Sequence, residues 1–406
     1  MRGRDPHESG RVASSLELLF DLTFVVAFGI AGNEFPHMAA EGEILLASAG
    51  YVFVLFAVIW SWINYTWFAS AFDTDDWAYR LVTMVIMCGV VVLALGIPPF
   101  FDSLHHGHVD NTVMVMGYVV MRIGMALHWG WAYLQAPEFR AGARIYLATL
   151  LAAQVGWVIL ALAHTSLRVF VLVGLTLLVV ELGGPFLGER VTTQREGQGS
   201  HTPWHPHHLA ERYGLLTIIT LGEGVVGTVA ALSPMVEEAG GWSLDSVLVV
   251  IAGIGLTLAI WWLYFSVDWG TLLHAHPTRC FGWGYGHIVL FMAIAAVGAG
   301  LHVAGYVLNH EAHRSGTLAV ASVAVPVLAF ILTLMWLYGR LTRTFDAVHI
   351  AMVEVMVILL VGALGMAAAE VPMGWCLLVA MAAPAVAVVL YETVGHRHQE
   401  RLFIVS

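Results

Sequence analysis

Long apolar runs alternate with short polar breaks along the whole chain. A helix that crosses a bilayer needs roughly 20 mostly apolar residues. This length divides the sequence into about twelve segments, near 15–33, 44–70, 79–100, 111–134, 144–164, 167–187, 209–232, 244–267, 284–307, 317–340, 345–368 and 373–395. The pattern predicts an all-α polytopic membrane protein with about twelve transmembrane helices.

Composition supports a membrane protein. The chain is 59% hydrophobic and 11% charged, whereas soluble domains carry about 25% charged residues. The net charge of −11 comes from acids scattered through loops and helix ends. With no basic patch, nucleic acid is not an expected partner; the expected partners are the lipid bilayer and a small-molecule or ion substrate. A homo-oligomer stays open.

The loop arginines predict the orientation. Glu17 and Asp21 argue against a cleavable signal peptide, because its apolar region carries no carboxylates. Among the arginines counted in loops, only Arg168 and Arg314 fall on the side opposite the termini. Since cytoplasmic loops carry an excess of basic residues, we expect both termini to be cytoplasmic, in a bacterial inner membrane.

The longest polar connection suggests two halves. We predict a six-helix half over 1–187, a cytoplasmic linker over 188–208 and a second six-helix half over 209–406. Glu17 and Glu211 open the first helix of each half, and 59–62 is echoed by 260–262. These echoes favour two parallel repeats, an arrangement found in transporters.

The seventh segment is the most informative. His208, Glu211, Arg212 and Glu223 share one face of the predicted helix. A charge in hydrocarbon costs at least ~2.5 kcal/mol, so such groups are usually paired and functional. Glu223 lies about 18 Å deeper than Glu211, and we expect Gly222, Gly224 and Gly227 to let another backbone approach. A Glu paired with an Arg to fix helix register is the structural alternative.

Arg122 lies at the middle of the fourth segment and needs an acidic partner. Glu223 and Glu354 are the candidates expected at similar depth. The pair is either a static ion pair or a site that binds an anion or gates a path.

The eleventh segment carries Asp346, His349 and Glu354 at increasing depth. An acid, an imidazole and a second acid in this order suit a proton path, because both groups titrate near neutrality when burial shifts them. The alternative is that Asp346 begins the helix favourably and His349 is interfacial.

The first segment carries Glu17 and Asp21 four residues apart on one face. Ser14 and Glu17 match a capping box, in which Glu17 satisfies backbone amides. Asp21 lies a turn deeper and has no such explanation. Function and structure are therefore evenly weighted for this pair.

Other residue types predict less. The histidines at 105–108 and 201–208 lie in loops without Cys partners, a weak metal signal, and no cofactor is expected. The Trp and Tyr residues are interpreted as interfacial belts.

Three blocks carry a resemblance to a known family: Leu16 to Val25, His208 to Leu215, and Leu221 to Glu223. The sequence resembles the bacterial low temperature requirement protein A family over nearly its whole length. The resemblance implies a polytopic inner-membrane protein and adds weight to Glu17, Asp21, Glu211, Arg212 and Glu223. It implies no substrate.

We therefore hypothesise a transporter, coupled to protons, in which Glu223 binds the proton or a substrate cation and Arg122 tunes it or meets an anion. His349 and Glu354 would connect this site to the cytoplasm. The alternatives are an intramembrane enzyme acting on a lipid or isoprenoid head group, and a non-catalytic scaffold or sensor. The enzyme is favoured if Glu17, Asp21, His208 and Glu211 gather at the cytoplasmic interface beside an opening to lipid and Glu223 is locked to Arg122.

Overall fold

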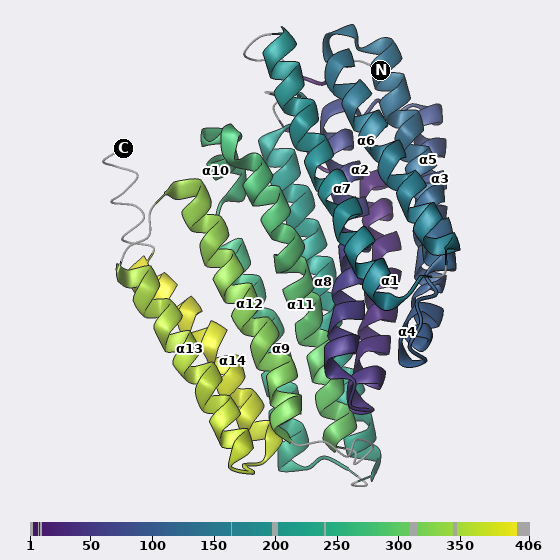
Figure 1. The fold of residues 1–406 in the computed structure, drawn as a ribbon. Coiled ribbons are helices and arrows are strands. Elements are labelled where there is room, and N and C mark those ends of the chain that lie inside the picture. The colour runs from purple at the N-terminus through teal and green to yellow at the C-terminus, as the bar shows by residue number, and fades with distance from the viewer. Residues whose placement is uncertain are drawn as a thin grey trace. The chain divides into compact units, whose positions relative to one another are not determined.

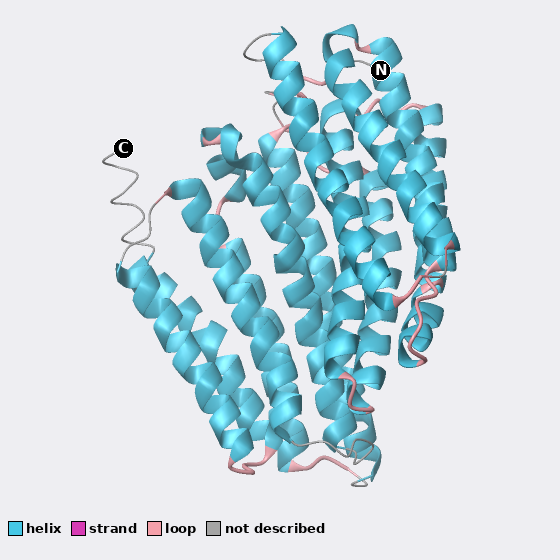
Figure 2. Cartoon of the chain, in the orientation of Figure 1, coloured by secondary structure: helices cyan, strands magenta, loops and turns pink. Residues whose placement is uncertain are grey.

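The computed structural model describes residues 3–6, 8, 10–163, 165–196, 202–238, 241–308, 316–343 and 347–395. Within these residues the chain is helical, with short connecting loops and no strand (Figure 2). Its first helices are α1 Ser15–Ala40, α2 Ile44–Phe72, α3 Trp77–Leu95, α4 Ile97–His105, α5 Thr112–Gln135, α6 Arg140–Leu162 and α7 Leu167–Glu196. The others are α8 Pro206–Glu238, α9 Leu244–Phe265, α10 Trp269–Ala275, α11 Cys280–Leu308, α12 Gly316–Thr342, α13 Ala347–Ala368 and α14 Met373–Leu390.

The prediction of twelve spans is confirmed. In the described part of the chain, 12 helices are long and apolar enough to cross a membrane. Two spans gain a short extra helix, since α4 extends α3 and α10 extends α9. One-turn 3-10 helices over Pro137–Phe139 and Pro277–Arg279 lead into α6 and α11.

Many large apolar side chains lie on the outer faces of the helices. Leu172 and Val179 on α7 are 68% and 71% exposed, and Ile358 on α13 is 68% exposed. Water disfavours so much contiguous apolar surface. Lipid chains satisfy it, so these faces agree with a multi-pass membrane protein.

The chain forms two compact units. Unit 1 comprises Met1–Glu34 and Phe53–Arg212, and unit 2 comprises Phe35–Val52 and Tyr213–Ser406. In unit 1, α3 packs on α5, α5 on α6 and α6 on α7. In unit 2, α11 packs on α12, α12 on α13 and α13 on α14, while α14 also packs on α9 (Figure 1). The third to sixth spans of each predicted half thus pack in the same serial order; the repeat itself stays a prediction.

Glycine brings two helices of unit 2 into backbone contact. A Cβ atom on Gly227 of α8 would fall inside the van der Waals radius of the Gly298 carbonyl oxygen of α11. Gly224 instead faces the hydroxyl of Thr257, and a Cβ on Gly222 would meet nothing within 4 Å. The expected close approach therefore occurs at Gly227.

This crossing gives a test of the packing. We expect Gly227→Ala to lower stability by about 1–3 kcal/mol, because the added methyl forces the two backbones apart. Gly222→Ala, on the same helix, is expected to be neutral or to stabilise by up to about 1 kcal/mol, since Ala favours the helix. Thermal unfolding of both variants in detergent measures the difference. Equal melting temperatures would contradict the close crossing.

Candidate functional site

Glu17 begins helix α1. Its Oε2 atom accepts a hydrogen bond from the Ser14 backbone N–H at 2.9 Å, and its own N–H donates to Ser14 Oγ at 3.2 Å. These reciprocal bonds form the predicted capping box. The cap fixes the position of the Glu17 side chain and leaves Oε1 available for other partners.

Arg212 of α8 meets both carboxylates of α1. Its Nη1 lies 2.8 Å from Glu17 Oε1, at an angle that departs from that of a hydrogen bond. Its Nη2 donates to Asp21 Oδ1. The three side chains are at most 2% exposed. One guanidinium therefore serves two buried carboxylates, as a planar fork of donors allows.

Two more side chains complete this arrangement. His208 Nε2 lies 3.2 Å from Glu17 Oε1. The indole N–H of Trp62 on α2 donates to Asp21 Oδ1 at 2.7 Å, and the Arg212 guanidinium lies 5.8 Å from the centre of a Trp62 ring. We call Glu17, Asp21, Trp62, His208 and Arg212 the α1–α8 cluster. It lies entirely within unit 1.

The α1–α8 cluster is not balanced in charge. With His208 neutral, two carboxylates face one guanidinium and one negative charge remains uncompensated. Asp21 Oδ2, His208 Nδ1 and Arg212 Nε are buried without hydrogen-bond partners among the described residues. A buried site with surplus negative charge and free polar atoms is suited to bind a proton or another small cation.

The N-terminal segment is tied to this region of unit 1. Arg11, 9% exposed, donates to the carbonyl oxygens of Ala69, at 2.9 Å, and Ser70, near the end of α2. The Ala13 N–H donates to Glu211 Oε2 at 3.1 Å. Glu211 thus binds the segment that precedes α1, and it is only partly buried.

A second buried ion pair lies elsewhere in unit 1. Arg122 of α5 donates to Glu181 of α7 and to the Tyr118 hydroxyl oxygen. The Tyr118 hydroxyl donates to Glu181 Oε2 at 2.6 Å, and the Trp157 indole N–H donates to Oε1 at 3.0 Å. The Arg122 and Glu181 side chains are 5% and 3% exposed. Here one cation balances one anion.

The expected partners of Arg122 were wrong. We expected Glu223 or Glu354, but the partner is Glu181, which the sequence analysis missed. The signal was available in the sequence. Glu181 is the only acidic residue in the run 167–187, and Arg122 is the only Asp, Glu, Lys or Arg in the run 111–134. Depth alone does not identify a partner when several acids have similar depth.

Glu223 is buried in unit 2, with 8% of its surface exposed. It forms no hydrogen bond or ion pair with the residues that the structure describes. Its backbone lies against Gly298, where a Cβ atom would clash with the Glu223 carbonyl group. Glu223 is therefore buried, as predicted, but it does not pair with Arg122.

The eleventh span gives less support to a proton path. On α13, His349 stacks against Tyr338 with ring centres 5.3 Å apart, and Glu354 is exposed. An exposed Glu354 does not form the buried end of a relay. Asp346 lies outside the described residues.

Several aromatic residues are buried, contrary to the interfacial belts expected. Trp60, Trp62 and Trp283 are at most 1% exposed. In unit 2, His287 lies within 6 Å of the ring centres of Tyr213, Tyr264 and Trp283. Aromatic side chains thus fill the interior of both units as well as helix ends.

No group of three or more His, Cys, Asp or Glu side chains in the described ranges is placed to hold a metal ion. His201 lies outside those ranges.

Comparison with known proteins identifies the family of the chain. Residues 12–386 match the sequence profile described as Bacterial low temperature requirement A protein (LtrA). The chain belongs to this family. It is also 26% identical over 351 residues to an uncharacterised protein of Rhizobium meliloti (strain 1021), with 83% of this chain and 80% of the relative covered. No solved structure matches the chain.

Membership covers every residue of the α1–α8 cluster, because Glu17 and Arg212 both lie inside the matched range. It confirms the resemblance seen in the sequence.

The charge balance of the α1–α8 cluster can be tested by removing its cation. We expect Arg212→Met to destabilise the protein by about 3–5 kcal/mol, because two buried carboxylates would lose their counter-charge. Arg80→Met is the control, since Arg80 pairs with Asp75 in an exposed site where both side chains are about half exposed, and such pairs contribute about 1 kcal/mol or less. Melting temperatures in detergent give the comparison. Equal losses would show that Arg212 is not a buried counter-ion.

Asp73, in the loop after α2, is predicted to make the stability of the protein depend on pH. Burial, with the negative charge of Glu17 nearby, raises its pKa from 3.8 to about 6, while Arg4 opposes the shift. The folded state therefore holds this proton more tightly than the unfolded state. The contribution of Asp73 to stability falls as pH rises from about 3.8 to about 6 and stays constant above it.

We expect Asp73→Asn to lose this component of the pH dependence. Asparagine still accepts the Asp75 N–H, which donates to Asp73 Oδ1 at 2.8 Å, but it cannot ionise. Melting temperatures of wild type and variant, measured from pH 4 to pH 7, test this. Parallel curves over that range would contradict a raised pKa at Asp73.

Proposed function

We propose that this protein is a proton-coupled membrane transporter and that the α1–α8 cluster is its proton-binding site. The observation that carries the proposal is the surplus carboxylate charge, with Glu17 and Asp21 sharing Arg212 in a site at most 2% exposed. In hydrocarbon, an uncompensated charge is costly and is usually functional. A proton on Asp21 or His208 neutralises the surplus.

Burial favours a proton over a larger ligand. Glu17, Asp21, His208 and Arg212 have almost no accessible surface. A lipid or isoprenoid head group needs room and contact with its reactive atoms, whereas a proton moves along hydrogen bonds and needs no cavity. The gathering of Glu17, Asp21 and His208 is only part of one of the two conditions that favour the enzyme, since that condition also requires Glu211 and an opening to lipid. The other condition fails, because Arg122 binds Glu181.

The proposed orientation follows from the arginines. The protein would lie in the bacterial cytoplasmic membrane with both termini cytoplasmic. Apart from Trp62 on α2, the residues of the α1–α8 cluster lie in the first two turns of α1 and of α8. Because these are the first and seventh spans, both helices would begin at the cytoplasmic face, and the site would take its proton from that side.

The test is proton flux in proteoliposomes that carry an internal pH dye, under an imposed potential. We expect Asp21→Asn to abolish most of the flux, because an amide still accepts the Trp62 N–H but cannot release a proton. Asp102→Asn is the control, since the Asp102 side chain is 76% exposed on α4.

A second variant, Glu223→Gln, distinguishes Asp21 from Glu223 as the proton-binding residue. Flux that is lost in Asp21→Asn and kept in Glu223→Gln assigns the proton to the α1–α8 cluster. Flux unchanged in folded Asp21→Asn would refute that assignment.

A further inference from the structure

Three arginines of unit 2 gather where α11 begins and α12 ends. Arg279 closes the one-turn helix before α11, Arg340 lies in the last turn of α12, and Arg343 follows that helix. Arg279 donates to the carbonyl oxygen of Leu341, which holds its side chain against the end of α12. Arg340 and Arg343 lie near enough for their charges to act on the Arg279 guanidinium. We call these three residues the arginine cluster.

The arginine cluster carries surplus positive charge. The arginine–carboxylate pairs of the described residues involve other arginines, namely Arg4, Arg80, Arg122 and Arg212. Asp346 is the only acid in the sequence 336–350, so counting it in full still leaves two positive charges. Like charges held close together repel each other. An anion from outside the chain relieves this repulsion.

Helix capping accounts for only part of this arrangement. Cations stabilise the C-terminus of a helix, and Arg279 does so through its bond to Leu341. Arg343 has a φ of 57°, a left-handed conformation that glycine or asparagine normally adopts at the end of a helix. Arginine at this position costs backbone free energy, although two other arginines already lie near the last carbonyls of α12. Its charge therefore has another use.

Glycines of α11 receive two side chains of α12. A Cβ atom on Gly282 would lie 3.4 Å from Arg340 Nε, and a Cβ atom on Gly286 would clash with the Trp336 ring. Arg340 and Trp336 are one turn apart on the same face of α12. Trp336 is 50% exposed, and indole rings are favoured at the level of lipid head groups. The seam between α11 and α12 thus has guanidiniums at its end and an exposed indole one turn deeper.

The same face of α12 continues as an apolar surface. Leu332 is 48% exposed and Val325 is 60% exposed, and both lie within about 40° of Trp336 around the helix axis. Val325 and Ala329 line a cavity of about 410 Å³, a size typical of ligand pockets. Its walls come from residues of unit 2 and are almost wholly apolar. Such a cavity suits a hydrocarbon chain rather than water.

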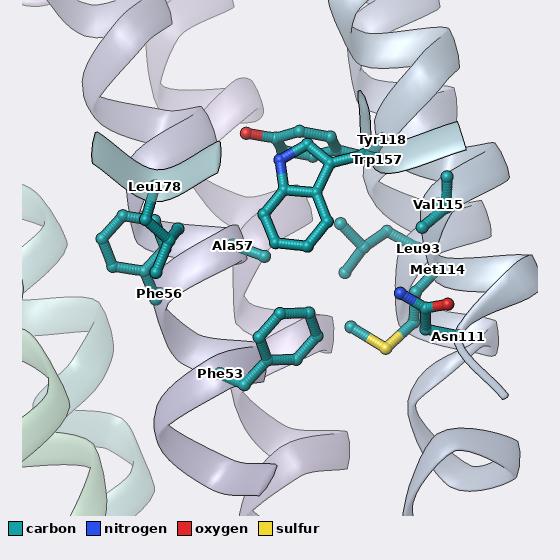
Figure 3. A pocket seen from close by; sticks show the side chains of 10 residues that line it. All are labelled: Phe53, Phe56, Ala57, Leu93, Asn111, Met114, Val115, Tyr118, Trp157 and Leu178. Carbon is teal, nitrogen blue, oxygen red and sulfur yellow. The ribbon is translucent and has the colours of Figure 1, made fainter. Parts of the chain in front are cut away.

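A cavity of unit 1 is far smaller. It is lined by Phe53, Met114 and Trp157 among others (Figure 3), and its volume is about 30 Å³. This is well below the roughly 300 Å³ at which ligand pockets begin. The cavity of unit 2 is therefore the one with room for a lipid chain.

The dimensions of unit 2 match those of a phospholipid. Arg340 and Ala329 are 11 residues apart, which is about 16 Å along the helix. Half of the hydrocarbon core of a bilayer is about 15 Å thick. A lipid whose phosphate binds Arg340 therefore reaches the near edge of the cavity with the end of a chain.

We propose that the seam between α11 and α12 binds an anionic phospholipid, with its phosphate at the arginine cluster, its glycerol against Trp336 and one chain end in the apolar cavity. Guanidiniums bind phosphate through paired hydrogen bonds, and basic pockets between transmembrane helices bind anionic head groups. With both termini cytoplasmic, as proposed above, this lipid belongs to the cytoplasmic leaflet. The site lies in unit 2 and does not depend on the α1–α8 cluster.

Native mass spectrometry of the full chain counts the lipids that stay bound. We expect one phosphatidylglycerol to remain bound where phosphatidylcholine, which has no net charge, dissociates. Combining Arg340→Gln with Arg343→Gln is expected to weaken phosphatidylglycerol binding about 30-fold, at about fivefold for each charge. Both side chains are exposed, so the fold is expected to survive, as the melting temperature in detergent shows.

Arg80→Gln is the control, because the exposed Arg80 already pairs with Asp75. It is expected to bind phosphatidylglycerol as tightly as wild type. Folded wild type that holds the two lipids equally would overturn the proposal. So would a control that loses as much affinity as the double variant, since binding would then follow overall charge.

A pair of tryptophan variants tests the position of the chain. Ala329→Trp fills the near edge of the cavity and is expected to weaken binding several-fold. Ile358→Trp, at a position of α13 that is 68% exposed, is expected to leave binding unchanged. Equal affinity of Ala329→Trp and wild type would show that no chain enters the cavity, and that part of the proposal would be wrong.

Competition with inorganic phosphate identifies the source of the phosphate group. Millimolar inorganic phosphate is expected to leave phosphatidylglycerol bound, because it lacks the chain contacts with α12. Displacement of the lipid would show that the arginine cluster binds a soluble anion, and it would overturn the assignment to a lipid.

Discussion

The central constraint is the cost of charge inside hydrocarbon. Unit 1 buries two arginines and three carboxylates from spans 1, 4, 6 and 7, and each charge needs a partner. Arg212 is shared by Glu17 and Asp21, so it links the beginnings of α1 and α8. Arg122 and Glu181 link α5 to α7. The apolar faces of these helices do not distinguish one neighbour from another in lipid, whereas these charge pairs do.

The two charged centres of unit 1 differ in their chemistry. The Glu181 carboxylate accepts from Arg122, Tyr118 and Trp157, and its charge is matched by one guanidinium. Arg212 has to divide its donors between two acids, and some polar atoms near it stay unpaired. The first arrangement is that of a fixed joint between α5 and α7. The second is that of a site whose charge state can change.

Sequence reasoning succeeded where the signal was local. Span length and mean apolar content predict twelve helices because each helix satisfies its own backbone in lipid. Ser14 and Glu17 are three residues apart, so their cap was visible as well. Partners that lie far apart in the sequence could not be identified in this way. Several acids compete for Arg122, and the spacing of Trp60 or Tyr213 does not reveal whether a ring faces lipid or the interior.

The two carboxylate oxygens of Glu17 have different partners. Oε2 accepts from the Ser14 N–H, and Oε1 forms the ion pair with Arg212. A proton on Asp21 leaves the Arg212 guanidinium to Glu17 alone. The first turn of α1 is therefore held by a carboxylate that shares its arginine with the proposed proton-binding group, so the order of that turn reports the charge state of the site. A spectroscopic label at the start of α1 would report the ionisation of the α1–α8 cluster without touching it.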